Sequence, residues 1–268
     1  MEAVDQSVRL LRRRQTRLRL LSYGTVAGVL ALWEASVRVG WVDPFVLPAP
    51  SNVVLRFGEE IRDEGLLFHA GLTVYRALVG FLLAAATGVL IGALMARRPL
   101  VRWFFDPLVS VGFPMPKISL MPIFVLWFGI YELPKIIMIA IGCVFPIISA
   151  TFLGASSIEK HLIWSARNLG TSENRLIWKV IVPAAFPQVM SGLQIAFPTA
   201  LILAVVTEML TTGGGLGNYM ILAARFADSE RVFVGITTIG VLGYALIWAI
   251  GWGRRRLLRW HQEASAVI

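Results

Sequence analysis

The stretch Ala77–Ala96, ALVGFLLAAATGVLIGALMA, contains no ionisable side chain. A helix of about 20 such residues spans the roughly 30 Å hydrocarbon core of a bilayer. The whole chain has this character, since 57% of its 268 residues are hydrophobic and 15% are charged. A soluble domain carries about 25% charged residues. Because several runs of this kind cannot all be buried in one small soluble core, the sequence predicts an all-α integral membrane protein.

Outward from this run, the apolar pattern predicts about six transmembrane helices, at Leu20–Val39, Leu66–Ala96, Trp103–Phe128, Pro134–Gly154, Phe186–Leu210 and Val232–Trp252. The expected organisation is a basic N-tail at 1–19, a six-helix domain at 20–252 and a C-tail at 253–268. The Arg-rich start imitates a secretory signal. However, its apolar run is longer than a signal core and lacks a small-x-small cleavage site, so we interpret it as an uncleaved span.

The net charge of +9 does not indicate nucleic-acid binding, because the basic residues cluster beside apolar runs. When loops are assigned alternately to the two sides of the membrane, most Lys and Arg residues fall on one side. Only five fall on the other: Arg56, Arg62, Lys135, Arg225 and Arg231. Since basic loops stay in the cytoplasm, both termini are expected to be cytoplasmic. The single cysteine, Cys143, lies in an apolar run and is expected to be a packing residue.

Small residues recur every four positions in the second span, at Gly80, Ala84, Gly88, Gly92 and Ala96. Such a stripe lets helix backbones approach closely in lipid, so we expect a packing role. The third span is interrupted by Phe113-Pro114-Met115-Pro116-Lys117 and by Pro122. Irregular backbone at membrane depth borders protein or a water-filled cavity, and transporters place substrate paths beside such breaks. An ordinary proline kink is the alternative.

Three charged residues lie in or near spans, where charge is costly. Glu208 is either a gate facing a pathway or a partner of Arg76, and Arg76 can also extend to the interface. Lys117 either attracts an anion or contacts carbonyl or carboxylate groups. The run Thr212–Gly215 lacks the Lys of a phosphate-binding loop and is interpreted as a flexible external turn.

A structured cytoplasmic loop is predicted at Ala155–Pro183. One helix is expected over Ile158–Asn168, ended by a left-handed Gly170. Ser172 can cap a second helix that Pro183 ends. This second helix carries an apolar stripe at helical spacing, formed by Leu176, Ile177, Val180 and Ile181.

The residues Ala166-Arg167-Asn168-Leu169-Gly170, followed by Pro183 in Val180-Ile181-Val182-Pro183-Ala184, resemble the coupling loop of ABC importer permeases. That family commonly reads Glu-Ala-Ala where this chain has Trp164-Ser165-Ala166. Further stretches resemble its aliphatic sulfonate/nitrate/taurine branch. These are Leu47–Ser51, Thr73–Phe81, Pro116–Pro122, Leu126–Ile130, Glu208–Leu210 and Gly215–Gly217.

The resemblance implies a type I importer (MetI-like) permease fold in the plasma (inner) membrane of a prokaryote. It implies two permease copies, two cytoplasmic ABC ATPase subunits that bind ATP and Mg, and an extracytoplasmic substrate-binding protein. The chain itself would be no enzyme and hold no cofactor. Its coupling residues would be Ala166, Arg167, Gly170, Leu176, Ile177, Val180, Ile181 and Pro183, and its pathway candidates Arg76, Met115, Pro116, Lys117 and Glu208.

The expected function is import of a small anionic solute, namely a sulfonate, taurine, nitrate or bicarbonate. One alternative is a pyrimidine vitamin precursor carried by the same class of permease. Another is a secondary transporter driven by an ion gradient, which would need neither an ATPase nor a structured cytoplasmic loop. A membrane-embedded enzyme would need a polar catalytic constellation within the spans.

Overall fold

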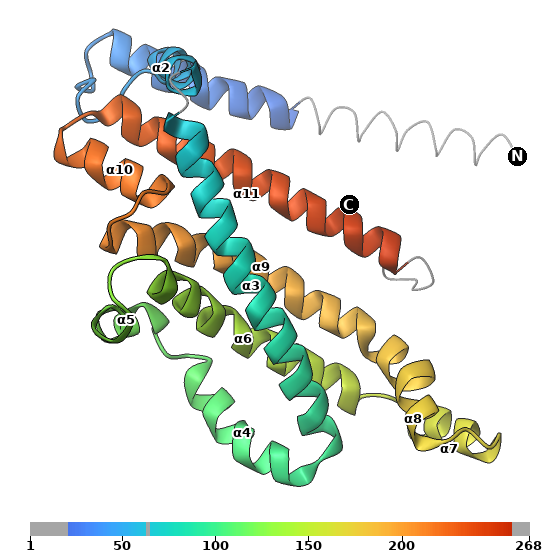
Figure 1. The fold of residues 1–268 in the computed structure, drawn as a ribbon. Helices are drawn as coiled ribbons and strands as arrows, with labels where there is room; N and C mark the ends of the chain where they lie inside the picture. Colours follow the sequence, from blue (N-terminus) through green and yellow to red (C-terminus); the bar gives the residue numbers. More distant parts are fainter. Residues whose placement is uncertain (1–20, 63–64, 259–268) are drawn as a thin grey trace, which may run out of the picture. The chain divides into compact units, whose positions relative to one another are not determined.

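The structure, a computed structural model, describes residues 21–62 and 65–258. These residues form helices joined by short connections, and they contain no β-strand (Figure 1). They divide into two compact units. The first comprises residues 21–62 and 223–234, and the second comprises residues 65–222 and 235–258. The predicted N-tail and the end of the predicted C-tail lie outside the described residues.

The second unit contains most of the helices. In chain order these are α3 (Gly65–Arg97), α4 (Pro99–Gly112), the 3-10 segment η1 (Lys117–Leu120), α5 (Met121–Phe128), α6 (Glu132–Ser156), α7 (Lys160–Asn168), α8 (Glu173–Leu176), the π-helical segment η2 (Ile177–Ile181) and α9 (Val182–Leu210). Two further helices, α10 (Leu216–Arg225) and α11 (Ser229–Leu257), have residues in both units.

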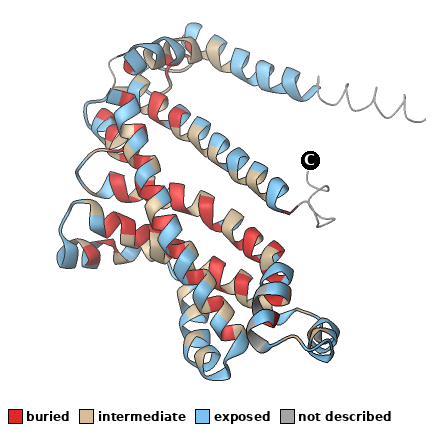
Figure 2. Cartoon of the chain, turned by 45° about the vertical axis from the view of Figure 1, so that its right-hand side comes forward, coloured by how far each residue is buried: buried red, intermediate tan, exposed pale blue. Residues whose placement is uncertain are grey.

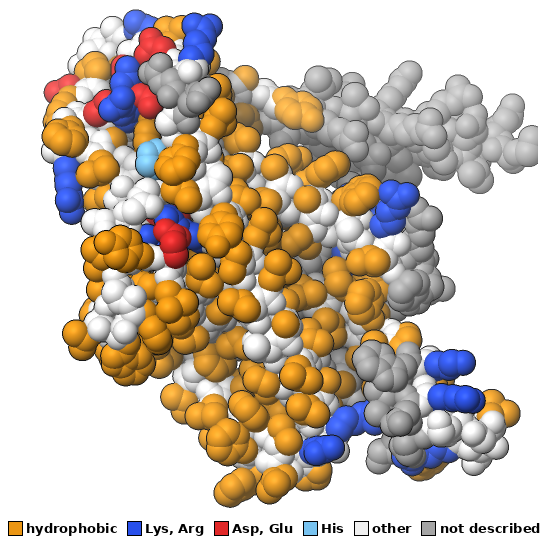
Figure 3. Space-filling view, viewed as in Figure 1, with side chains coloured by type: hydrophobic (Ala, Val, Ile, Leu, Met, Phe, Trp, Pro, Cys, Tyr) orange, Lys and Arg blue, Asp and Glu red, His pale blue; other side chains and the backbone are white. Residues whose placement is uncertain are grey.

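Four helical stretches among the described residues are long and apolar enough to cross a membrane: Gly65–Arg97, Glu132–Ser156, Lys179–Leu210 and Ser229–Leu257. The pair Pro99–Gly112 and Lys117–Phe128 makes a fifth if it is one broken span. Hydrophobic side chains cover much of the surface visible in Figure 3. The all-α membrane fold is thus confirmed. Residues 21–38 are helical, as predicted for the first span, but their described part does not reach the same criterion.

The core of the second unit is formed by α3, α6 and α9, whose buried faces are visible in Figure 2. Phe81 of α3 and Phe197 of α9 meet edge to face, with 4.9 Å between ring centroids. Cys143 of α6 is fully buried in the same cluster, and its thiol donates to the Ala196 carbonyl. The packing role predicted for this cysteine is confirmed.

The small-residue stripe of α3 lies against α6. A Cβ added at Gly80 would lie 2.6 Å from Cγ2 of Ile139, and one at Gly88 would lie 2.9 Å from Cγ2 of Ile147. Neither distance is compatible with an ordinary carbon–carbon contact, so the two helices approach as closely as they do because these positions lack side chains. The structure therefore confirms the predicted packing role.

The interruption after α4 is a true break, because α4 and the following η1–α5 segment are bent by 98°. Pro116 precedes η1, and Pro122 lies in the first turn of α5, where its missing N–H costs nothing. Met121 and Phe124 of α5 are buried against Met138 of α6. The broken segment is thus anchored on the core.

The first unit joins α2 (Pro50–Arg62) to residues 223–234 by polar contacts. Glu60, only 5% exposed, accepts from Arg231 Nε at 2.7 Å and pairs with Arg56. Asn52 donates to Glu230. Ser51 lies in the first turn of α2, and its hydroxyl donates to Glu34 at 2.8 Å. Glu60 of α2 is therefore occupied by contacts within this unit.

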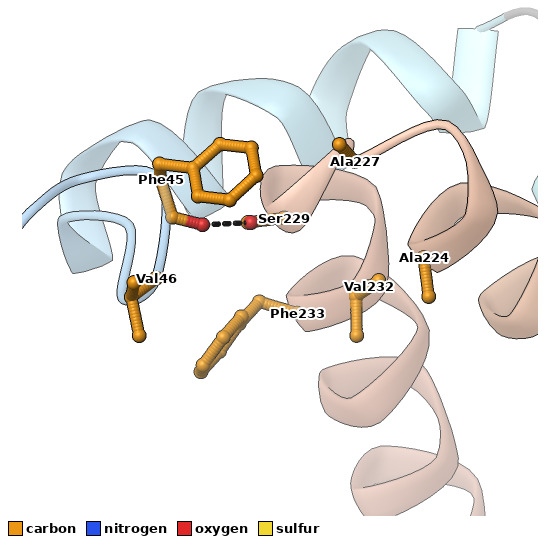
Figure 4. A pocket seen from close by; sticks show the side chains of 7 residues that line it. All are labelled: Phe45, Val46, Ala224, Ala227, Ser229, Val232 and Phe233. Carbon is orange, nitrogen blue, oxygen red and sulfur yellow. Dashed lines mark hydrogen bonds between the residues drawn. The ribbon is translucent and has the colours of Figure 1, made fainter.

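This unit also holds a small apolar pocket of about 230 Å³ (Figure 4). It is lined by Phe45, Val46, Ala224, Ala227, Ser229, Val232 and Phe233. The Ser229 hydroxyl donates to the Phe45 carbonyl and so fixes the connection that precedes α2. The remaining lining is apolar, and the pocket lacks the convergent polar groups that a specific small-molecule site needs.

Candidate functional site

The first half of the predicted coupling loop is confirmed: a helix ends at Asn168, and Gly170 follows it in the left-handed conformation. α7 ends at Asn168, and Gly170 has φ +75°. The Thr171 N–H bonds the Ala166 carbonyl, and the Gly170 N–H bonds the Arg167 carbonyl. This pair of bonds is a Schellman motif, which needs a left-handed residue at the glycine position. Gly170 is therefore required by backbone conformation.

The second half of the loop differs from the prediction. Pro183 does not end a helix, because α8, η2 and α9 follow one another without a break and Pro183 lies in the first turn of α9. Proline lacks the N–H that an α-helix would use, and the wider π turn just before it accommodates that loss. α6 also runs to Ser156, so the non-spanning part of the loop is shorter than 155–183.

The predicted apolar stripe is partly confirmed. Leu176 is fully buried and Ile181 is 5% exposed, while Val180 is half-buried. The side chain of Ile177 lies outside the described set. The continuous helical run from α8 through η2 to α9 therefore has buried apolar residues on both sides of its π turn.

Three large apolar side chains in α7 and at its C-cap are exposed. Leu162 is 50% exposed, Trp164 55% and Leu169 85%. Arg167 is also exposed, and Ala166 is half-buried. Large apolar side chains on a short helix outside the bundle core indicate a protein-binding face.

A second feature of the second unit is a cluster of four charged residues, Arg76, Glu132, Lys135 and Glu208, which we call the charge cluster. Arg76 of α3 is fully buried. Its Nε and Nη2 bind the two oxygens of Glu132 at 2.6 and 2.7 Å, and its Nη1 binds Glu208 at 2.8 Å. The carbonyls of Gly213 and Gly214 accept the remaining two N–H groups. All five donors of the guanidinium are thus satisfied.

Glu208 of α9 is also fully buried, and every group that it meets is a donor. Oε1 accepts from Arg76, and Oε2 accepts from the Thr73 hydroxyl at 2.8 Å and the Gly217 N–H at 3.0 Å. Of the two roles predicted for Glu208, a gate or a partner of Arg76, the structure contains the pairing with Arg76. Arg76 correspondingly does not extend to the interface.

The glycine run, predicted to be a flexible external turn, packs against the charge cluster. Gly213, Gly214 and Gly215 all have positive φ, between +77° and +99°. A Cβ at Gly215 would lie 2.1 Å from Cδ of Glu208. The Gly215 N–H donates to Nδ1 of His69. The left-handed backbone of this run therefore brings its carbonyls onto the charge cluster.

Lys117 lies in the broken span and contacts a carbonyl. Its Nζ donates to the Phe113 carbonyl, the C-cap of α4, at 2.6 Å and lies over the Phe145 ring at 5.6 Å. A cation at a helix C-terminus is favourable. Met115 and Pro116 are exposed beside it. Among the described residues, no hydrogen bond or ion pair joins Lys117 to the charge cluster.

Sequence reasoning missed Glu132 and Lys135 as site residues and counted Lys135 only as a loop charge. It also missed Thr73 and His69. The sequence did contain a signal. Three consecutive glycines, Gly213–Gly215, follow Glu208 closely, and such a run can form a loop that closes over buried charges. Which charges meet could be read only from the packed helices.

The chain matches known proteins over most of its length. Residues 88–259 match the family "Binding-protein-dependent transport system inner membrane component". The putative aliphatic sulfonates transport permease protein SsuC of Bacillus subtilis is 35% identical over 238 residues, 88% of this chain and 86% of that protein. The taurine transport system permease protein TauC of Escherichia coli is 29% identical, covering 91% of each.

Two further matches bear on the fold and on the range of cargo in the family. The formylaminopyrimidine transport permease protein ThiX of Halalkalibacterium halodurans is 32% identical over 82% of this chain and 88% of that protein. A solved structure of the MetNI methionine ABC transporter in inward-facing conformations has a TM-score of 0.61 at 19% identity. It covers 75% of this chain and 97% of that chain, and shows a shared fold.

The family match, the relatives along nearly the whole chain and the shared permease fold all agree with the helix-loop-helix between α6 and α9. This chain belongs to the family of inner-membrane components of binding-protein-dependent transport systems, and it is an ABC importer permease.

Proposed function

We propose that this permease imports a small sulfonate, such as taurine or an alkanesulfonate. The observation that carries the proposal is the similarity, over about nine-tenths of the chain, to permeases named for aliphatic sulfonates and taurine. Reconstitution of the permease with its ATPase and binding protein in proteoliposomes tests it. ATP-dependent accumulation of labelled taurine or methanesulfonate is expected, and accumulation without the ATPase would contradict the proposal.

A pyrimidine cargo is the second candidate, because ThiX is similar over four-fifths of this chain. The same proteoliposomes distinguish the two. Formylaminopyrimidine that competes with uptake, while excess taurine does not, would favour the pyrimidine.

The proposed assembly contains two copies of this chain, two cytoplasmic ATPase subunits that bind ATP and Mg, and one extracytoplasmic binding protein. The exposed apolar side chains of Leu162 and Trp164 in α7 and of Leu169 at its C-cap support docking of an ATPase there. Docking would bury these side chains, and each fully buried large apolar residue contributes about 1.5–3 kcal/mol. Purified complex should therefore lose its ATPase subunits when Leu169 is changed to Asp.

Closure of the ATPases on ATP would move α7 and the helix that begins at α8, and so switch the bundle between inward and outward access. The buried Leu176 and Ile181 would transmit that movement to α9. Ala166, Arg167 and Gly170 would lie at the contact with the ATPase.

Two variants of Gly170 test this coupling. Gly170→Val places a β-branched residue at φ +75°, and the left-handed conformation costs roughly 1–2 kcal/mol for such residues. Gly170→Asn is the matched control, because asparagine tolerates this conformation. If backbone shape is what matters, only the valine variant loses uptake and transport-coupled ATPase activity. If close approach of the ATPase matters, both variants lose them. Full uptake in both variants would contradict a coupling role.

We place the translocation pathway beside the broken span, where Met115 and Pro116 are exposed next to the 98° bend. Arg76 and Glu208 would brace the outer end of the pathway. Both termini would lie in the cytoplasm of a prokaryotic cell with the permease in its plasma (inner) membrane. Reporter fusions that are active only in the cytoplasm should be active at both ends.

A further inference from the structure

We propose that Arg76 and Lys135 form a binding site for the acid group of the transported anion. Glu132 would be their resident counter-ion and would be displaced when the anion arrives. The inference rests on the proposed function in one respect, the choice of a sulfonate as ligand.

The first observation is the asymmetry of the two carboxylates that bind Arg76. Glu208 is fully buried and held by three donors, whereas the Glu132 side chain is 44% exposed. Glu132 occupies the Nε–Nη2 edge of the guanidinium in a two-bond fork. That edge binds carboxylates, phosphates and other planar pairs of oxygens. Glu132 can therefore leave into water without uncovering Glu208.

The second observation is the state of Lys135. This residue is fully buried, and an ammonium group has three N–H donors. Among the described residues its Nζ makes one hydrogen bond, to the Thr212 carbonyl at 2.6 Å. The nearest oxygen of Glu132 is 3.9 Å away, beyond hydrogen-bond distance. Lys135 thus lies beside the exchangeable carboxylate at ion-pair distance, and its ammonium group can donate to an anion that takes the place of Glu132.

A sulfonate fits these groups chemically. It has three oxygens, enough for both bonds of the Arg76 fork and for one bond from Lys135, whereas a carboxylate has two. Exchange of one monovalent anion for another leaves the net charge of the cluster unchanged at zero, with two cations and two anions. The large cost of burying an unpaired charge is therefore avoided at each end of the exchange.

Cysteine chemistry tests the proposal in the purified transporter. The chain's only cysteine, Cys143, is fully buried and serves as a silent background. Glu132→Cys removes the resident counter-ion and leaves a reporter thiol beside Arg76 and Lys135. Leu133→Cys is the matched control, because Leu133 is 51% exposed and adjacent. Two methanethiosulfonate reagents are compared, one carrying a sulfonate and one carrying a trimethylammonium group.

Relative to the control, the thiol at position 132 should favour the sulfonate reagent by about tenfold, the lower end of the enrichment that a focused field gives. Millimolar methanesulfonate should slow its modification, and equal concentrations of sodium chloride should not. Adding Lys135→Met should reduce the preference. Equal rates for both reagents, or no protection by methanesulfonate, would overturn the proposal.

A second measurement covers the case in which the cysteine variant does not assemble. In the unchanged transporter, methanesulfonate should raise the melting temperature more than chloride does, because a ligand that binds only the folded state stabilises it. Lys135→Met should lose that difference, and its absence in the unchanged protein would also count against the site. Taurine uptake is measured separately. Uptake without protection would reject this site and keep the proposed cargo, whereas protection without uptake would keep an anion site and reject the cargo.

Discussion

Glu208→Ala is the substitution for which the structure gives the largest expected effect on stability. It removes an acceptor from Arg76, from the Thr73 hydroxyl and from the Gly217 N–H, all in a fully buried position. Removal of one partner from a buried ion pair costs about 3–5 kcal/mol. Because Arg76 keeps its two bonds to Glu132, we expect the lower end of that range, about 3 kcal/mol.

The assay is the free energy of unfolding of the detergent-solubilised protein, or its melting temperature, with the fraction of monodisperse protein as a second readout. Glu59→Ala is the control, since Glu59 is 61% exposed and pairs with Arg56 at the surface. Surface pairs of this kind contribute about 0–1 kcal/mol. Glu208→Gln is also informative. Its amide NH₂ would face groups that are all donors, so it should recover little stability. A Glu208→Ala variant as stable as Glu59→Ala would refute the structural role assigned to the charge cluster.

Three further substitutions follow from the packing. Gly88→Leu should destabilise the protein by about 1–3 kcal/mol, because a Cβ there already lies 2.9 Å from an isoleucine of α6, while Gly240→Leu, with no atom within 4 Å of the added Cβ, should have little effect in the same thermal assay. Gly215→Ala combines φ +99° with a Cβ 2.1 Å from a buried carboxyl carbon, so no monodisperse protein is expected by size-exclusion chromatography. Lys117→Met should leave the apparent affinity for taurine unchanged if its role is to cap α4 through the Phe113 carbonyl, and a large loss of affinity would restore the anion-contact alternative.

The coupling loop shows how far local sequence carries a prediction. The left-handed Gly170 and the end of α7 were predicted correctly, because the bonds that form the turn join residues three to five positions apart. The end of the second helix at Pro183 was wrong. Whether a proline stops a helix depends on whether the preceding turn can widen, and here η2 provides that widening.

The membrane spans were predictable for a different reason. Hydropathy is a sum over about 20 neighbouring residues, so it needs no knowledge of which helices touch. The break at Phe113–Lys117 could likewise be predicted, since its prolines remove N–H donors at known positions. The 98° bend itself depends on how α5 packs on α6 through Met121, Phe124 and Met138.

By itself, the sequence determined the membrane class, the positions of most spans, the packing stripe of α3 and the resemblance that places the chain in its family, because each is encoded within one continuous segment. Only the tertiary structure decided that Arg76 meets Glu208, which lies 132 positions away, and that Glu132, Lys135 and the glycine run complete the same cluster. The reason is physical. A buried charge is tolerated only where its partners converge, and that convergence is set by the packing of α3, α6 and α9 against one another.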